Sequence, residues 1–180
     1  GAGALQSFAP WAAARVQGRK PAYFTMSAYD PERVERFKGR SSDNVLALGG
    51  FWLDIEGEEG KAGGGYAGRQ AAIEAVGAFI KASGARPTFI VLTGGEGLHL
   101  HFFLDTPTTP AEWKPRAVAL AALAAAHGLR IDAAVTTNAA QIMRAPGSLH
   151  QKTGEEAQAH EIRAQRWTLA GWDALVGFDA

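Results

Sequence analysis

The chain has 180 residues, with 18 acidic and 18 basic side chains and no cysteine. A chain of this length is expected to form one domain around a hydrophobic core. Zero net charge argues against a protein that coats DNA by charge alone, and the lack of cysteine excludes disulfides and thiolate-bound zinc. No apolar run reaches membrane-spanning length and no secretion signal opens the chain, so we expect a cytoplasmic protein without a membrane partner.

The N-terminal part of the sequence predicts alternating helices and strands. Asp30-Pro31-Glu32 combines an N-cap residue, a proline at the first helical position and an acidic first turn, which is typical of a helix start. Residues 45–56 are mostly apolar and predict a buried strand with an acidic end. The elements expected before this strand are a helix over 5–16, a strand over 22–27 and a short helix over 30–37, and after it come a glycine-rich loop over 57–68 and an amphipathic helix over 66–82.

The C-terminal part predicts a β-hairpin followed by a long helix. Two apolar segments flank a glycine-rich turn, which favours a hairpin. Thr109 and Glu112 form a capping-box pattern, so a helix is expected from there through Ala126, with Gly128 ending it. The other expected elements are strands over 89–93, 98–104 and 157–169, an extended piece over 130–133, and helical turns over 137–144 and 172–176. This alternation predicts a mixed α/β domain.

Two acidic residues stand at the end of the strand predicted over 45–56. Side chains alternate along a strand, so Asp54 and Glu56 share one face while Leu53 and Ile55 point to the other. Two carboxylates on one face repel each other, and a divalent cation is the usual agent that compensates for this. Oxygen ligands favour Mg²⁺ or Mn²⁺ over zinc. The alternative is a pair of solvated charges at a strand end.

The second motif is the predicted hairpin turn with the strand that follows it. His99, His101 and Phe103 fall on one strand face, so the histidines are expected to be displayed there. The glycines of the turn let backbone amides approach an anionic phosphate closely. The alternative is a tight hairpin with two solvent-facing histidines.

Asp132 is the third candidate residue. It follows a short apolar stretch, which favours a position at a strand end. A third carboxylate there would complete a two-metal site with Asp54 and Glu56. The alternative is an ordinary loop aspartate.

The fourth motif surrounds the Pro146-Gly147 turn. Arg144, His150 and Lys152 bracket this turn, and together they would make a clamp for a triphosphate. The alternative is a basic surface loop.

These four motifs, in this order, resemble the archaeo-eukaryotic primases, especially phage and plasmid primase–polymerases. The pattern of that family is an acid-x-acid strand end, a small-x-His strand, a hydrophobic-Asp pair and, in many members, an Arg-x-Pro-Gly segment with a lysine beyond. The matching segments are Asp54-Ile55-Glu56, Gly97-Leu98-His99, Ile131-Asp132, and Arg144-Ala145-Pro146-Gly147 with Lys152. The resemblance covers residues 23–153.

The resemblance implies a fold and a set of site residues. The fold class is α/β (α+β), with an antiparallel sheet like that of an RNA-recognition motif flanked by helices, and a small N-terminal α/β lobe. The lobe elements would lie in about 1–45 and the catalytic core in 46–170 of a single domain over 1–180, excised from a longer protein. The implied metal ligands are Asp54, Glu56 and Asp132. The implied nucleotide contacts are Thr93, Gly94, Gly95, Gly97, His99, Arg144, His150 and Lys152.

The resemblance also implies an activity. Such an enzyme is a metal-dependent DNA primase/polymerase that joins (d)NTPs to a 3′-hydroxyl and releases pyrophosphate, with two Mg²⁺ or Mn²⁺ ions. Its partners would be a single-stranded DNA template, a primer strand and (d)NTPs, together with a replicative helicase or accessory domain. Gly97 departs from the family pattern, which often has serine there, so one side-chain hydroxyl contact is missing.

Two alternatives stay open on the sequence. His99-Leu100-His101 also fits the His-hydrophobic-His motif of DNA-nicking replication initiators and relaxases. That class needs a nucleophilic tyrosine after the histidines, whereas Tyr23, Tyr29 and Tyr66 all precede them. The second alternative is an inactive primase-like domain that only binds nucleotides or single-stranded DNA.

Overall fold

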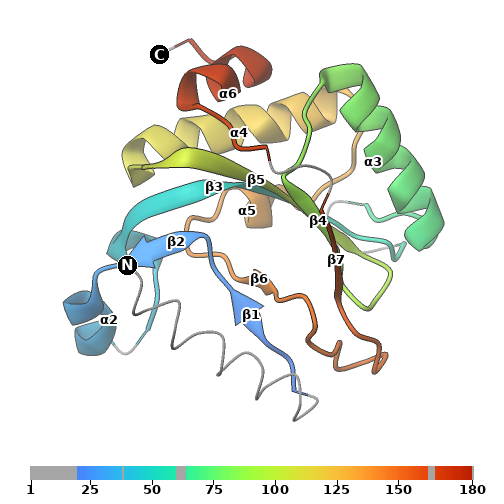
Figure 1. Ribbon diagram of the computed structural model, residues 1–180, viewed down its shortest axis with the longest axis horizontal. Coiled ribbons are helices and arrows are strands. Elements are labelled where there is room, and N and C mark those ends of the chain that lie inside the picture. Colours follow the sequence, from blue (N-terminus) through green and yellow to red (C-terminus); the bar gives the residue numbers. More distant parts are fainter. Residues whose placement is uncertain (1–19, 38, 60–63, 162–164, 180) are drawn as a thin grey trace.

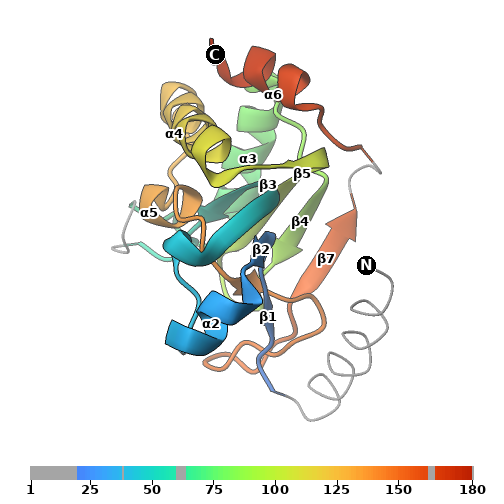
Figure 2. The ribbon, with the colours of Figure 1, turned by 90° about the vertical axis from the view of Figure 1, so that its left-hand side faces the viewer.

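The structure is a computed structural model, and it describes residues 20–37, 39–59, 64–161 and 165–179. The helix expected over 5–16 lies outside these ranges. Figures 1 and 2 show a curled sheet with helices α3, α4 and α6 on one side and strands β1 and β6 on the other. No helix of the described residues is long and apolar enough to cross a lipid bilayer. The mixed α/β prediction with an antiparallel sheet flanked by helices is confirmed.

Five strands form the main sheet, in the order β2-β3-β5-β4-β7, and every neighbouring pair is antiparallel. The strands are β2 (Ser27–Tyr29), β3 (Val45–Ile55), β4 (Phe89–Leu92), β5 (Leu98–Thr108) and β7 (Gln158–Glu161). A second, two-stranded sheet pairs β1 (Tyr23–Phe24) with β6 (Met143–Arg144). The helices are α2 (Pro31–Phe37), α3 (Arg69–Ser83), α4 (Pro110–Ala126), α5 (Ala133–Thr136) and α6 (Leu169–Val176), with a 3₁₀ turn at Ser42–Asn44.

The register of β3 against β5 separates a core face from a site face. Leu53 lies opposite Leu100, and both are fully buried on the side that the helices cover. On the same side Phe51 stacks on Trp172 of α6, with ring centroids 4.3 Å apart. Because side chains alternate along a strand, Asp54 of β3 faces the other way. The buried core therefore fixes which side of the sheet carries the acidic residue.

Local signals account for most of the helix ends. Asp30 Oδ1 accepts the backbone N–H groups of Glu32 and Arg33 at the start of α2. The capping box of α4 is present: Thr109 Oγ1 accepts the N–H of Glu112, and the Glu112 carboxylate accepts the N–H of Thr109. These bonds satisfy amides that the first helical turn leaves without partners.

Some element bounds differ from the sequence prediction. The strand expected over 22–27 is divided into β1 and β2, which join different sheets. The helical turns expected over 137–144 are wrong, because the turn forms earlier, as α5, and 143–144 are paired as β6. Asp132 explains the shift, since its side chain accepts the N–H groups of Ala134 and Val135 and so starts a helix at Ala133.

The last strand and the last helix also have bounds that differ from the sequence prediction. Of the strand expected over 157–169, the described residues form β7, and 162–164 lie outside the described ranges. The last helix begins earlier than expected, because Thr168 Oγ1 accepts the N–H of Gly171 and caps α6. Helix α6 is then tied to α4 by Asp173, whose two carboxylate oxygens lie 2.6 and 2.8 Å from Nε and Nη2 of Arg116.

Candidate active site

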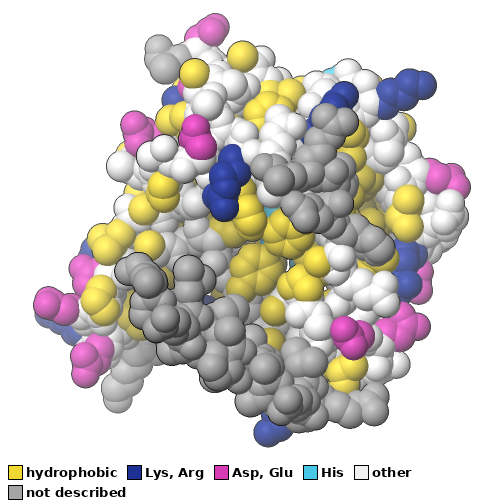
Figure 3. Space-filling model, viewed as in Figure 1, with side chains coloured by type: hydrophobic (Ala, Val, Ile, Leu, Met, Phe, Trp, Pro, Cys, Tyr) yellow, Lys and Arg dark blue, Asp and Glu magenta, His cyan; other side chains and the backbone are white. Residues whose placement is uncertain are grey.

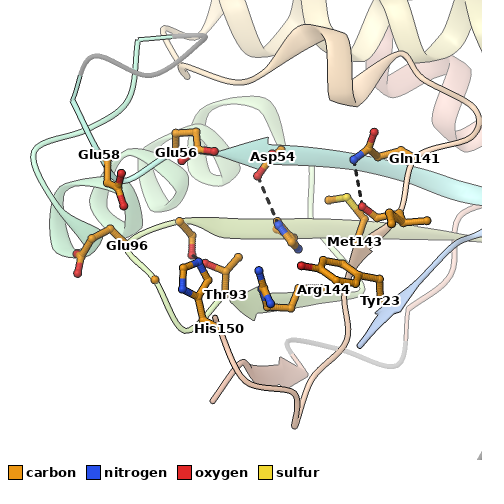
Figure 4. Close-up of a pocket in the computed structure, with 14 residues that line it drawn as sticks. Tyr23, Asp54, Glu56, Glu58, Thr93, Glu96, Gln141, Met143, Arg144 and His150 are labelled. Carbon is orange, nitrogen blue, oxygen red and sulfur yellow. Dashed lines mark hydrogen bonds and ion pairs between the residues drawn. The ribbon is translucent and has the colours of Figure 1, made fainter. Parts of the chain in front are cut away.

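A polar pocket opens on the face of the sheet opposite α3, α4 and α6 (Figure 4). It lies where β3 and β5 meet the turn after β4 and the segment around β6. Eight of the eleven residues expected to form the site line it: Asp54, Glu56, Thr93, Gly95, Gly97, His99, Arg144 and His150. The structure therefore brings together motifs that stand as far as 96 residues apart in the sequence.

Asp54 and His99 are direct cross-strand partners at the centre of this pocket. They are paired in the register of β3 and β5, and Asp54 Oδ1 lies 3.5 Å from His99 Nε2. Burial, and secondarily the positive charge of Arg144, lower the pKa of His99 to about 3. The imidazole is therefore uncharged at neutral pH, so its contact with Asp54 is not an ion pair. Its Nδ1 is buried without a hydrogen-bond partner among the described residues, which leaves a polar atom for a bound ligand.

The glycine turn between β4 and β5 forms one wall. Thr93 closes it, because its N–H and its hydroxyl both donate to the carbonyl of Gly97, at 3.1 and 3.0 Å. Gly94 has a φ of +78°, which favours glycine. A Cβ on Gly95 would lie 3.2 Å from His150 Nε2, so glycine lets this imidazole approach the turn. Gly94 does not line the pocket, but its positive φ sets the path of the glycine turn, whose residues Gly95 and Gly97 do.

The segment after β6 forms the opposite wall. The Arg144 guanidinium lies over the ring of Tyr23, 5.0 Å from its centroid, and donates to the carbonyl of Leu149. The Thr153 hydroxyl donates to the carbonyl of Gly94 at 2.6 Å and so joins this segment to the glycine turn. The two phosphate-binding motifs expected from the sequence are therefore in direct contact. Lys152 is exposed and does not line the pocket.

Asp132 lies beside Asp54 without turning its carboxylate into the pocket. Its backbone N–H donates to the Asp54 carbonyl at 3.0 Å, so the two residues are neighbours. The Asp132 carboxylate caps α5, and the residue is not among those that line the pocket. In the described part of the chain, no three His, Asp or Glu side chains form a metal-ligand set. The backbones of Asp54 and Asp132 are thus adjacent, while the Asp132 carboxylate is bonded to amides of α5.

A search of solved structures finds proteins with the same architecture. The chain matches the AEP domain of the primase–polymerase of cyanophage S-2L with a TM-score of 0.62 and 19% sequence identity, over 87% of this chain and 70% of the other. The chain has the primase–polymerase fold. It also matches the polymerase domain of Mycobacterium tuberculosis Ligase D in complex with DNA, with a TM-score of 0.44 and 21% identity, over 87% of this chain and 56% of the other. Neither known family models nor curated proteins give a match.

The pocket of this primase–polymerase fold contains acidic and polar side chains that the sequence analysis did not single out. They are Tyr23, Glu58, Glu96 and Gln141. Tyr23 reaches the pocket through the pairing of β1 with β6, in which it lies opposite Arg144, 121 positions further along the chain. Glu58 and Glu96 stand close in sequence to predicted site residues, and that proximity is the signal that could have found them. No local signal marks Gln141.

The residues present suit one divalent cation better than two. Asp54 and Glu56 both line the pocket, and Mg²⁺ is commonly held by one or two carboxylates together with substrate phosphates. Among the described residues, four carboxylates and one Lys or Arg side chain line the pocket. An anionic triphosphate would be repelled there unless a cation offset the negative charge. Asp132 would take part in holding a second ion only if its carboxylate left the N-terminus of α5.

His101 is not displayed as expected. It is fully buried, with its ring stacked on Phe89 at 4.5 Å and its Nδ1 3.3 Å from the sulfur of Met26. Burial is the main cause that lowers its pKa well below the ordinary value. The rings of His99 and His101 are 6.2 Å apart at 82°, and no group of three or more His, Asp or Glu side chains in the described part of the chain could hold a metal ion. Within the described residues, the geometry gives that alternative no support.

Proposed function

We propose that the chain is a metal-dependent nucleotidyltransferase that extends or starts a nucleic-acid strand on a DNA template. The observation that carries the proposal is the single pocket that gathers Asp54, Glu56, His99 and Arg144 on the open face of a primase–polymerase fold. The acidic residues for a cation and the residues that would contact phosphates come from three separate segments of the chain. This combination is what a nucleoside triphosphate with its divalent cation requires.

The triphosphate would lie between the glycine turn and the segment after β6. Arg144 is the charged group on this side, and it lines the same pocket as His99, whose pKa is lowered by burial and, to a smaller extent, by the Arg144 charge. The neutral imidazole of His99 can donate one hydrogen bond to a phosphate oxygen. His150 contacts the same turn and would add a second imidazole. Lys152 would have to move to reach the phosphates.

Asp54 and Glu56 would hold Mg²⁺ or Mn²⁺ next to the triphosphate. Such an ion, when bound, offsets phosphate charge and lowers the pKa of the attacking 3′-hydroxyl. Asp132 would become a ligand for a second ion if its carboxylate turned toward Asp54, whose carbonyl its N–H already meets. The chain's own contribution is to place the 3′-hydroxyl and the α-phosphate in line and to bind the leaving pyrophosphate at Arg144 and His99.

The nucleic-acid partners follow from this chemistry. A template strand and a primer end must reach the pocket from the face of the sheet opposite α3, α4 and α6. On the face that Figure 3 shows, acidic and basic side chains are scattered around hydrophobic ones, without a broad cationic patch among the described residues. On this face we therefore expect surface charge to contribute little to DNA binding. The single domain over 1–180 would be the catalytic core of this enzyme.

The test is strand synthesis on single-stranded DNA, with and without a primer, in Mg²⁺ or Mn²⁺. We expect labelled product from the parent and a loss of at least about 100-fold in the double variant Asp54→Asn, Glu56→Gln. Asp105→Asn is the matched control, because this exposed aspartate of β5 lies outside the pocket. Equal product from the parent and the double variant would refute the proposal.

A second measurement detects the cation without any turnover. Mn²⁺ should raise the midpoint of thermal unfolding of the parent and of Asp105→Asn, because a ligand that binds only the folded state stabilises it. The Asp54→Asn, Glu56→Gln variant should show no such rise. An equal rise in all three proteins would place the cation elsewhere.

A further inference from the structure

Arg69, the first residue of α3, joins three segments that surround the pocket. Its guanidinium donates twice to the carbonyl of Gly95, from Nε at 3.1 Å and from Nη2 at 2.5 Å. Nη2 also lies 3.1 Å from a carboxylate oxygen of Glu155. The side chain is 32% exposed, and Arg69 is not among the residues that line the pocket. Arg69 therefore contacts both the glycine turn and the segment after β6 from outside the pocket.

The backbone of Arg69 is tied to the same turn. Its N–H donates to the Glu96 carboxylate at 2.7 Å. The N-cap residue of α3 is Gly68, which offers no side chain for this purpose, so Glu96 caps the helix from a distant part of the chain. The start of α3 and the glycine turn thus hold each other through two consecutive residues, Gly95 and Glu96. This linkage gives the turn a rigid base in a helix of 15 residues.

The bond to Gly95 has a directional consequence. The peptide bonds of the described residues are trans, so the C=O of Gly95 and the N–H of Glu96 point in opposite directions. A guanidinium that holds this carbonyl with two hydrogen bonds fixes the orientation of the whole peptide plane. Glycine turns bind phosphates through such amides, and without an anchor a glycine-rich turn can reorient freely.

Glu155 extends the effect to the opposite wall. Its carbonyl accepts the N–H of His150 at 2.8 Å, while its carboxylate meets Arg69. A Cβ on Gly94 would lie only 2.6 Å from the same carbonyl, so the two walls are in close contact there. Arg69 is therefore linked through Glu155 to the position of His150, and through Gly95 to the glycine turn.

We propose that Arg69 is a positioning residue for nucleotide binding, which holds the glycine turn and the His150 segment at the spacing a triphosphate needs. It acts through Gly95 and Glu155 and does not touch the substrate itself. The inference rests on the proposed function, since it assigns the triphosphate to the space between these two walls. It predicts that the loss of Arg69 weakens nucleotide binding and leaves the chemical step much less affected.

The experiment compares Arg69→Ala and Arg69→Lys with the parent and with Arg33→Ala. Arg33 is a matched control, because it also donates to a backbone carbonyl, that of Asp43, from the first turn of a helix, but lies outside the pocket. We expect Arg69→Ala to raise KM for the nucleotide about tenfold or more, with kcat within about threefold of the parent. Arg69→Lys should recover part of the loss, because an ammonium group donates to Gly95 without the paired geometry of a guanidinium.

Equilibrium binding of a nucleoside triphosphate with Mg²⁺, measured below the unfolding midpoint of each variant, separates the two proposals. If the parent binds the triphosphate but makes no strand, the polymerase assignment fails, and weaker binding by Arg69→Ala still supports the inference. Unchanged binding and unchanged KM in a folded Arg69→Ala variant would overturn it. A parent that binds no triphosphate would overturn both.

Discussion

Asp132 donates its backbone N–H to the carbonyl of Asp54, yet its carboxylate is engaged at the N-terminus of α5. The two residues stand 78 positions apart in the sequence and are neighbours across one hydrogen bond. Their side chains nevertheless serve different tasks in this structure: one lines the pocket and the other caps a helix.

Substitutions of Asp132 can separate its two roles. Asparagine caps helices about as well as aspartate, so Asp132→Asn should keep the free energy of unfolding within about 0.5 kcal/mol of the parent, whereas Asp132→Ala should lose about 1 kcal/mol. If Asp132 binds a metal ion during turnover, both variants should lose strand synthesis by on the order of 100-fold. Urea unfolding and primer extension would be measured on the same preparations. Full activity in Asp132→Asn would show that the residue is only a helix cap.

Gly94 and Gly128 offer a matched pair of glycine substitutions. Both have a positive φ, of +78° and +71°, so alanine at either position is expected to cost about 1 kcal/mol of stability. A Cβ at Gly128 meets nothing within 4 Å, whereas at Gly94 it would clash with the Glu155 carbonyl. We therefore expect Gly94→Ala to lose more stability and to weaken nucleotide binding, while Gly128→Ala leaves binding unchanged. Calorimetry and nucleotide titration check this, and equal binding by the two variants would contradict it.

His101 makes the stability of the protein sensitive to acid. The unfolded chain protonates this residue near its ordinary pKa of 6.5, while burial keeps the folded form neutral to a much lower pH. Below pH 6.5 the unfolded state thus binds more protons, so the free energy of unfolding decreases as the pH falls, by up to about 1.4 kcal/mol per pH unit for this residue.

Phenylalanine at this position should remove that contribution. His101→Phe keeps the stacking on Phe89 and deletes the buried Nε2, which has no hydrogen-bond partner among the described residues. We expect equal or greater stability at pH 7 and a shallower loss between pH 6.5 and 4.5. Urea titrations at several pH values measure this. The same pH dependence in parent and variant would show that other groups dominate acid unfolding.

The Arg116–Asp173 pair should contribute strongly to the stability of the helical side. Arg116 is 7% exposed, and its guanidinium binds both carboxylate oxygens of Asp173 across the α4–α6 contact. Asp173→Ala leaves a buried cation without its carboxylate, which typically costs about 3 kcal/mol or more. Chemical unfolding would measure the loss, with the exposed Asp179→Ala as control. A difference below about 1 kcal/mol would mean that water or another group replaces the carboxylate.

The sequence alone predicted most of the elements and many of the pocket residues. Alternation along 45–56 placed Asp54 on one strand face, and the capping box located the start of α4, because both signals act between residues a few positions apart. The order of four short motifs indicated the fold that the comparison with cyanophage S-2L confirms. The division into a small N-terminal lobe and a core stays a prediction, as do the roles of the site residues.

Only the tertiary structure decided which side chains meet. The burial of His101, the approach of Tyr23 through the β1–β6 pairing and the anchoring of Gly95 by Arg69 each join residues far apart in the chain. No periodicity or cap signal carries such information, because these contacts depend on how the sheet curls and on which face the helices cover. For Asp132, the local capping signal and the distant metal-ligand role compete for one carboxylate, and in this structure the local hydrogen bonds hold it.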